Sequence, residues 1–248
     1  MPMSPVKTIA ALLAAALSAS ALPASAQSMI VRASGPSAGQ YRAGTRLADT
    51  ARLTLKQGDI VTLLDSRGTR TVRGPGIFPV ITTASADTIR PAQLSSLMDT
   101  QKTRRARTGA VRGDAADARP RNPSIWFADI AQSSDFCVAD PAAVQLWRAD
   151  SSAAASYAVT QGTASATISF AAGQSTAPWP IDLPVSEGGD YRLSGAGLSQ
   201  PVALRFRLLT QVPEDMDAIA ALLIENKCEA QLSLLIETTA QPEPAPAG

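Results

Sequence analysis

Hydrophobic and polar residues alternate most regularly between residues 202 and 208. Val202, Leu204, Phe206 and Leu208 alternate there with Ala203, Arg205 and Arg207. Successive side chains of an extended chain point to opposite faces, so alternation with a period of two residues predicts a half-buried strand here. Shorter segments with strand character cover residues 144–148, 156–160, 164–170 and 190–193. Residues 125–239 are therefore predicted to form a β-rich, sandwich-like domain.

The period changes after Pro213. Met216, Ile219, Ala220, Leu222 and Leu223 recur at helical spacing, which predicts one late α-helix that ends near Glu225, with Asn226 as its break. From Cys228 onward the pattern returns to a period of two. Ala230, Leu232, Leu234 and Ile236 alternate with Glu229, Gln231, Ser233 and Glu237, which predicts a last strand beside the helix.

Residues 27–81 are predicted to form a separate small β module, a meander or barrel-like sheet. Short segments with β-branched residues lie between breaks such as Gln57-Gly58-Asp59 and Asp65-Ser66-Arg67-Gly68. Gly74-Pro75-Gly76 ends the series. We interpret it as a turn, because a phosphate-binding loop needs a following Lys-Ser/Thr and a helix.

The glycine and leucine spacing of this module resembles the exported β domain of FecR-like proteins. The matching residues are Gly44-x-x-Leu47, Leu53-x-Leu55, Gly58-Asp59-x-Val61-x-Leu63 and Gly68-x-x-x-Val72-x-Gly74-Pro75-Gly76. The resemblance covers residues 30–80 and implies a stacked-strand or β-helical module in the periplasm of a Gram-negative bacterium, serving protein contact or signal relay. The sigma regulators of that family also carry a cytoplasmic segment and a membrane span, which this sequence does not show. Residues 125–240 resemble no family.

Residues 1–26 have the order of a secretory signal peptide. Lys7 precedes an apolar run from Ile9 to Leu17, and Ala24-Ser25-Ala26 follows as a cleavage site. That run is shorter than the roughly 20 apolar residues that span a bilayer, and every later apolar run is broken by charge, Pro or Gly. We therefore expect an exported, periplasmic protein without a transmembrane span in the mature chain.

Residues 82–124 are predicted to connect the two modules. The spacing of Leu94, Leu97 and Met98 predicts a short helix over residues 88–100. Beyond it the segment is rich in Arg, Ala, Gly and Asp, which is typical of a flexible linker. Its basic cluster, Lys102 to Arg107, is interpreted as part of a solvated linker. An acidic partner, an anionic surface and a proteolytic site are the alternatives. Residues 240–248 are Pro- and Ala-rich and are predicted to be a disordered tail.

Cys137 and Cys228 are the only cysteines in the chain. In an exported protein, two cysteines usually pair, and only one intramolecular pairing exists. We predict a structural disulfide between them. A reactive thiol and a pair of metal ligands are the alternatives, although the cysteines lack the Cys-x-x-Cys spacing and the chain lacks histidine.

Composition narrows the functional classes. Without histidine there is no Ser-His-Asp triad, Cys-His pair or His-based metal site. Removing residues 1–26 takes away Lys7 and leaves 21 basic residues against 21 acidic ones, so net charge gives no reason to expect nucleic acid as a partner. Aromatic residues make up only 4%, which also disfavours a base-stacking surface. We expect no cofactor, no metal and no enzymatic activity.

Three groups of side chains remain as candidates. The residues Trp147, Trp179 and Tyr191 suit a sugar or peptide groove, and Arg205 and Arg207 on one strand face suit a carboxylate, although packing and ordinary ion pairing explain both groups. The acidic cluster Glu214, Asp215 and Asp217 suits either a helix start or a metal or acid/base site.

The sequence thus predicts a non-enzymatic exported interaction or scaffold protein with a protein partner in the cell envelope. An accessory role in an envelope signalling system is the more specific hypothesis. The alternative is a glycan- or peptide-binding module at the cell wall. An enzyme with carboxylate chemistry ranks third.

Overall fold

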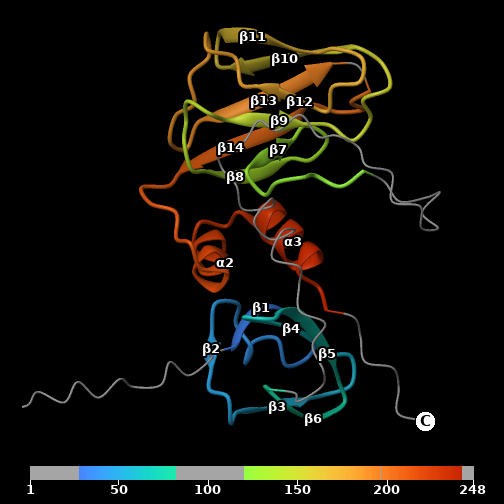
Figure 1. The fold of residues 1–248 in the computed structure, drawn as a ribbon, viewed down its shortest axis with the longest axis vertical. Coiled ribbons are helices and arrows are strands. Elements are labelled where there is room, and N and C mark those ends of the chain that lie inside the picture. The colour runs from blue at the N-terminus through green and yellow to red at the C-terminus, as the bar shows by residue number, and fades with distance from the viewer. Residues whose placement is uncertain (1–27, 82–119, 196, 242–248) are drawn as a thin grey trace, which may run out of the picture.

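The computed structural model describes residues 28–81, 120–195 and 197–241. The chain is mainly β, as predicted, with two β-rich lobes and the helices α2 and α3 between them (Figure 1). The predicted signal peptide, the helix at 88–100, the cluster Lys102 to Arg107 and the tail beyond residue 241 lie outside the described residues. Among the described residues, no helix combines the length and the apolar character that crossing a membrane requires.

Two sheets pack face to face in the larger lobe. The five-stranded sheet has the order β11-β10-β13-β14-β8 and the three-stranded sheet the order β12-β9-β7. Their strands are β7 (Phe127–Asp129), β8 (Ser134–Val138), β9 (Gln145–Trp147), β10 (Ala155–Gln161), β11 (Ala164–Phe170), β12 (Thr176–Pro178), β13 (Asp190–Gly195) and β14 (Val202–Leu208). Because apolar and polar residues alternate along β14, its apolar side chains share one face. Val202, Leu204 and Phe206 on that face are buried in the core between the sheets.

The smaller lobe contains two more sheets, ordered β2-β1-β4-β5 and β3-β6. Their strands are β1 (Ser28–Ser34), β2 (Arg46–Leu47), β3 (Arg52–Leu55), β4 (Ile60–Asp65), β5 (Gly68–Arg73) and β6 (Gly76–Pro79). The central strands β1 and β4 are buried on both faces. Ile30 and Leu63 face the lobe's own core, whereas Met29, Val31 and Leu64 pack against the helices. The smaller lobe therefore depends on the helices to cover one side of its main sheet.

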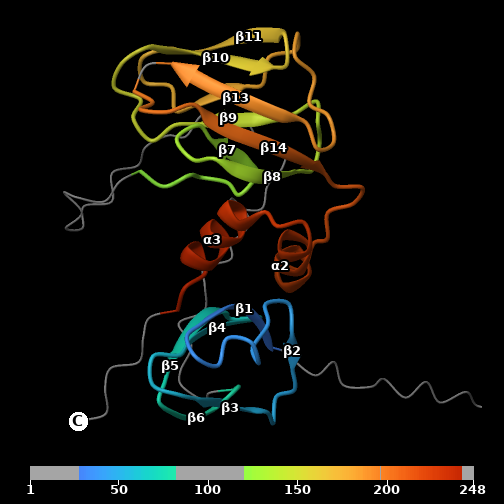
Figure 2. The same cartoon turned by 180° about the vertical axis from the view of Figure 1, so that it is seen from behind.

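Both helices, α2 (Met216–Glu225) and α3 (Glu229–Thr238), lie between the lobes in both views (Figures 1 and 2). Ile219 and Leu223 of α2 and Leu232 and Leu235 of α3 share one buried cluster with Trp126 and with residues of both lobes. The predicted late helix is confirmed as α2. It begins at Met216, after the N-cap Asp215, and ends at the C-cap Asn226.

The predicted strand after Cys228 is wrong, because this segment is the helix α3. Its buried residues are Gln231, Leu232 and Leu235, which follow helical spacing. The alternating apolar residues in the sequence therefore concealed a second pattern with a period near 3.6. Glu, Ala, Gln and Leu dominate the segment, and all are strong helix formers.

The predicted disulfide is confirmed between Cys137 and Cys228, with the two Cα atoms 5.8 Å apart. It joins β8 to the turn between the helices, rather than to a last strand. In that turn the N–H of Cys228 donates to the carbonyl of Leu223, and the N–H of Lys227 donates to that of Ile224. These two bonds define a Schellman ending of α2, with Lys227 at the left-handed position (φ 60°). The disulfide thus fixes the start of α3 against the sandwich.

The other end of α3 is bonded to the smaller lobe. The N–H of Thr69 in β5 donates to the carbonyl of Thr239 at 2.8 Å, and the N–H of Gln241 donates to the carbonyl of Thr69 at 2.7 Å. The Thr69 hydroxyl also donates to the carbonyl of Ile236. Thr69 and Ala240 form a parallel bridge, so the chain after α3 begins an additional strand on β5. The helix α3 is therefore anchored to one lobe at each end.

Candidate functional site

Trp179 and Tyr191 lie together in the core of the sandwich. Their ring centroids are 5.1 Å apart, and both rings make edge-to-face contacts with Phe206. Tyr191 is 0% exposed, and its hydroxyl donates to the carbonyl of Pro184 at 2.7 Å. The indole N–H of Trp179 donates to the carbonyl of Leu183. These two residues therefore hold the sandwich together and present little surface to a ligand.

Arg205 and Arg207 lie on the outer face of the five-stranded sheet, in a row of ion pairs. Arg205 is 2.6 Å from Asp190 and 3.9 Å from Asp135, and Arg207 is 3.6 Å from Asp135 and 3.7 Å from Glu187. The hydrogen bond to Asp190 raises the pKa of the Arg205 guanidinium. Each arginine already has carboxylate partners in its own sheet or in the turn before β13, so this row is not an open anion site.

The predicted acidic cluster lies around the start of α2. Asp215 is the N-cap, and Asp217 in the first turn pairs with Arg46 of the smaller lobe at 2.7 Å. Within the described residues, no group of three or more Cys, Asp or Glu is arranged to hold a metal ion. The structure gives Asp217 a role in joining α2 to the smaller lobe.

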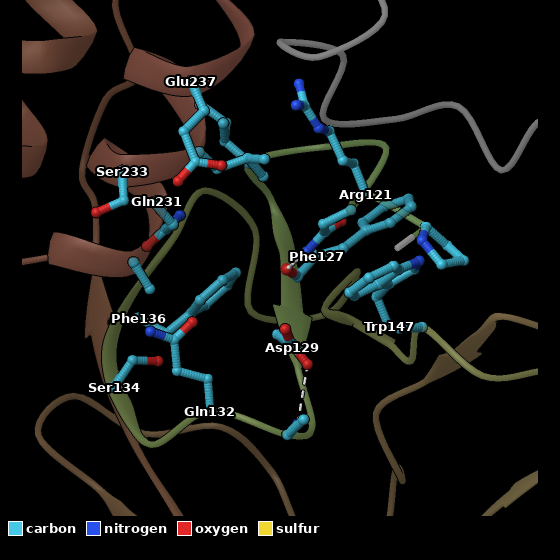
Figure 3. Close-up of a pocket in the computed structure, with 17 residues that line it drawn as sticks. Arg121, Phe127, Asp129, Gln132, Ser134, Phe136, Trp147, Gln231, Ser233 and Glu237 are labelled. Carbon is cyan, nitrogen blue, oxygen red and sulfur yellow. Dashed lines mark hydrogen bonds between the residues drawn. The ribbon is translucent and has the colours of Figure 1, made fainter. Parts of the chain in front are cut away.

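Trp147 lies away from the other predicted residues and lines a groove of about 680 Å³. The groove is located where the edge strands β7 and β8 of the two sheets meet α3 (Figure 3). Its floor is apolar and includes Ile125 and Phe136, both buried. In Figure 3, Asp129 lies at the centre, between Phe127 and Trp147 on one side and Phe136 on the other.

The outer face of the three-stranded sheet positions the aromatic side of the groove. Ala128 and Ile130 point into the core, so Phe127 and Asp129 point outward. In the parallel pairing of β7 with β9, Asp129 lies opposite Trp147. One face of two short strands therefore brings two rings and one carboxyl group together.

The free edge of β7 retains a backbone donor. The N–H of Ile130 donates to the carbonyl of Trp147 in β9, so the peptide groups of Phe127 and Asp129 point away from β9. The N–H of Phe127 donates to the carbonyl of Ser124, and the carbonyl of Phe127 accepts from the side-chain amide of Asn122. The carbonyl of Asp129 accepts from the N–H of Gln132 at 3.4 Å. Within the described part of the chain, the N–H of Asp129 has no partner.

The free edge of β8 is closed at one residue. Gln231 of α3 accepts from the N–H of Cys137 at 2.6 Å and donates to its carbonyl at 3.0 Å. This buried side chain takes the place of a neighbouring strand. The peptide groups of Asp135 point to the same edge and have no partner among the residues described. The groove thus begins where the cover provided by α3 ends.

The acidic groups of the groove lack cationic partners among the described residues. The Asp129 carboxyl accepts a hydrogen bond from the N–H of Ala131 at 2.9 Å, and neither it nor Glu237 of α3 takes part in an ion pair. Burial raises the pKa of Asp129, and the bond from Ala131 opposes this shift. Arg121 is the cationic side chain of the described lining, and its guanidinium points away from Asp129 in Figure 3.

Sequence reasoning found Trp147 but missed Asp129 and Glu237. The signal for Asp129 was a short alternation, in which Ala128 and Ile130 are apolar and Phe127 and Asp129 form the opposite face. Glu237 was hidden by the wrong prediction of a strand. On a helix it shares one face with Ala230, Ser233 and Leu234, all of which line the groove.

Comparisons of this chain with protein-family models, curated proteins and solved structures give no match.

Proposed function

We propose that this chain is a non-enzymatic, exported interaction protein that binds an extended segment of a protein partner in the groove between β7, β8 and α3. The observation that carries the proposal is the groove itself, where the free edges of β7 and β8 meet an aromatic wall and the N–H of Asp129 is unpartnered among the residues described. An extended polypeptide satisfies such edge groups with its own backbone.

The size and composition of the groove support a peptide ligand. A volume of about 680 Å³ falls within the range of small-molecule and peptide sites. Apolar and aromatic residues form its floor and one wall, and polar side chains such as Gln132, Ser134 and Ser233 lie around them. This combination of an apolar floor and a polar rim is typical of interfaces between proteins.

We assign the partner to the periplasm of a Gram-negative envelope. The secretory order of residues 1–26 and the FecR-like spacing of residues 30–80 support this assignment, and the disulfide between Cys137 and Cys228 is compatible with an oxidising compartment. An accessory role in envelope signalling follows from the same resemblance.

A glycan is the second candidate ligand. Trp147 and Phe127 lie beside the carboxyl and amide groups of Asp129 and Gln132 in the groove. A sugar ring can stack on an aromatic side chain while polar groups beside it bond the hydroxyls. Trp147 is only 5% exposed, however, so little of its ring face is open to a sugar. This favours the polypeptide.

Blocking the groove tests the proposal. A displayed library of random 12-residue peptides is selected on the protein, and binding of the selected peptides is measured by calorimetry. Ala149→Trp places a large side chain in the groove lining, and we expect it to weaken binding at least tenfold. Ala158→Trp, on the exposed outer face of β10, is the matched control and should have no effect.

Two results would contradict the proposal. One is a library that yields no peptide sensitive to Ala149→Trp. The other is retention of the protein on purified peptidoglycan that Ala149→Trp abolishes and Ala158→Trp preserves, which would favour the glycan.

A further inference from the structure

Asp129 differs from Asp135 and Asp190 of the same lobe because it has no ion pair among the described residues. It differs from Asp140 and Asp150, which also have no ion pair there, because they are exposed and it is partly buried. Asp135 and Asp190 each pair with an arginine, whereas Asp129 lies in a groove, half buried, with a single hydrogen bond from the N–H of Ala131. Burial raises its pKa because the ionised form loses water without gaining a cation. A cation from outside the chain would complete this site.

The surroundings of Asp129 fit a long cationic side chain. Trp147 lies opposite Asp129 in the register of β7 with β9, and Phe127 lies two residues earlier on the same face. Aromatic rings attract the cation and pack against the methylene groups of lysine or arginine. Phe127 is partly exposed and offers this contact, whereas Trp147, which is 5% exposed, forms the wall beside it. A carboxylate beside such a ring is therefore suited to a long cationic side chain.

The charge balance of the groove points the same way. Among the described lining residues, Asp129 and Glu237 are acidic and Arg121 alone is basic. Glu237 lies on α3, opposite β7, and Arg121 points its guanidinium away from Asp129 (Figure 3). The centre of the groove is therefore negative where the carboxyl group of Asp129 lies.

We propose that the groove selects polypeptide segments that carry a lysine or arginine, whose cation is bound by the Asp129 carboxylate beside the rings of Phe127 and Trp147. The inference rests on the proposed function, because it names the chemistry of the segment that the groove binds. The unpartnered N–H of Asp129 then lies beside the backbone of the same segment, so one residue contacts both its main chain and its side chain.

The test uses peptides selected on the native protein from the random library. We expect them to share a lysine or arginine at one position. In a synthetic copy, replacing that lysine by norleucine keeps the methylene groups and removes the charge, and should weaken binding at least tenfold. Asp129→Asn should weaken binding of the lysine peptide by the same factor and change binding of the norleucine peptide less than twofold.

Matched variants keep this test specific. Asn at position 129 retains an oxygen that accepts from the N–H of Ala131, so the thermal midpoint should stay close to that of the native protein. Asp182→Asn, in an exposed loop outside the groove, removes the same charge and should leave binding unchanged. Glu237→Gln should weaken binding about twofold, because Glu237 is exposed.

The outcomes separate the two proposals. Peptides that depend on the groove but lack a cation, or that bind Asp129→Asn as tightly as the native protein, would overturn the inference and leave the proposed function standing. The absence of any groove-dependent peptide would contradict the proposed function itself, and with it the inference.

Discussion

Two stripes of residues run along α3, and they meet very different surroundings. Cys228, Leu232, Leu235 and Thr239 form the first stripe, and Ala230, Ser233, Leu234 and Glu237 form the second. On the first stripe the polar groups have partners: the Thr239 hydroxyl, for example, donates to the carbonyl of Leu235. On the second, Glu237 has no ion pair among the residues described, and Asp129 across the groove has none either.

The difference separates structural polar groups from available ones. Gln231 lies between the stripes, and both its amide oxygen and its amide nitrogen bond the backbone of Cys137, so it closes an edge. Asp129 has a single bond from its own turn and leaves most of its acceptor capacity unused. A buried polar group with all its partners stabilises the fold, and one without them marks a place where a ligand adds something.

Removing the disulfide should give the largest effect on the first stripe. The bridge closes a separation of 91 residues, for which the chain-entropy model gives about 4–5 kcal/mol as an upper value. Replacing Cys137 and Cys228 together by alanine should therefore lower the free energy of unfolding in urea by about 3–4 kcal/mol. A reducing agent should destabilise the native protein and leave the double variant unchanged. Equal stability of the native protein and the double variant without reducing agent would contradict this expectation.

Truncating Gln231 should have the next largest effect. Gln231→Ala leaves the buried N–H and carbonyl of Cys137 without partners, and each such group costs about 1–3 kcal/mol. We expect a loss of about 2–3 kcal/mol in urea unfolding. Glu237→Ala on the second stripe of the same helix is the control, and it should change stability by less than about 0.5 kcal/mol. Similar losses in both variants would remove the contrast between the stripes.

The smallest effect concerns the pH dependence of Asp129. Its pKa is raised in the folded protein by burial, so the folded state holds the proton more tightly than the unfolded chain does. The contribution of this group is therefore most favourable below its unfolded pKa, and it is lost as pH rises through the folded pKa. Relative to Asp129→Asn, the native protein should lose less than about 1 kcal/mol between pH 3 and pH 7, because the group is partly solvated.

Asp59 is an internal control, because its contribution to the free energy of unfolding should change with pH in the opposite direction to that of Asp129. Burial disfavours its ionised form, but N–H donors of Ser37 and Lys56 outweigh this and lower its pKa. Its contribution is present above the unfolded pKa and is lost as pH falls through the folded one. Urea midpoints of Asp59→Asn and Asp129→Asn across acidic pH should therefore shift in opposite senses relative to the native protein. Arg121 and Glu237 in the groove lining, and Arg32, which bonds Ser233 of the lining, are the same in all three proteins.

The sequence predicted the strands that bury one face in the core and expose the other to water. Val202 to Leu208 alternates cleanly because one face of β14 lies in the core and the other carries Arg205 and Arg207. The sequence did not predict α3, because its residues are apolar on several sides: the first stripe is buried in the helical cluster, and Leu234 and Ile236 pack partly against it. A helix covered on more than one side loses the simple pattern of a surface helix.

The groove was out of reach for a different reason. Trp147, Asp129 and Glu237 come from three elements, and only the pairing of β7 with β9 and the position of α3 bring them together. Residue type could not distinguish Trp147 from Trp179, because a tryptophan in a core and one beside a groove carry the same local signal. The structure separates them through their neighbours: Trp179 contacts two other aromatic rings, whereas Trp147 lies opposite a carboxyl group.

The bonds between Thr69 and the end of α3 have a consequence for the order in which the chain folds. They connect residues 167 to 172 positions apart, and the residues that cover one face of β1 and β4 come from the same late helices. A chain that leaves a ribosome or a translocation channel N-terminus first therefore exposes β1 to β6 long before α2 and α3, which cover them, have emerged. Such distant contacts slow folding and leave one face of the first sheet exposed in the meantime. During that interval, the exposed apolar face of the smaller lobe is a binding surface for chaperones.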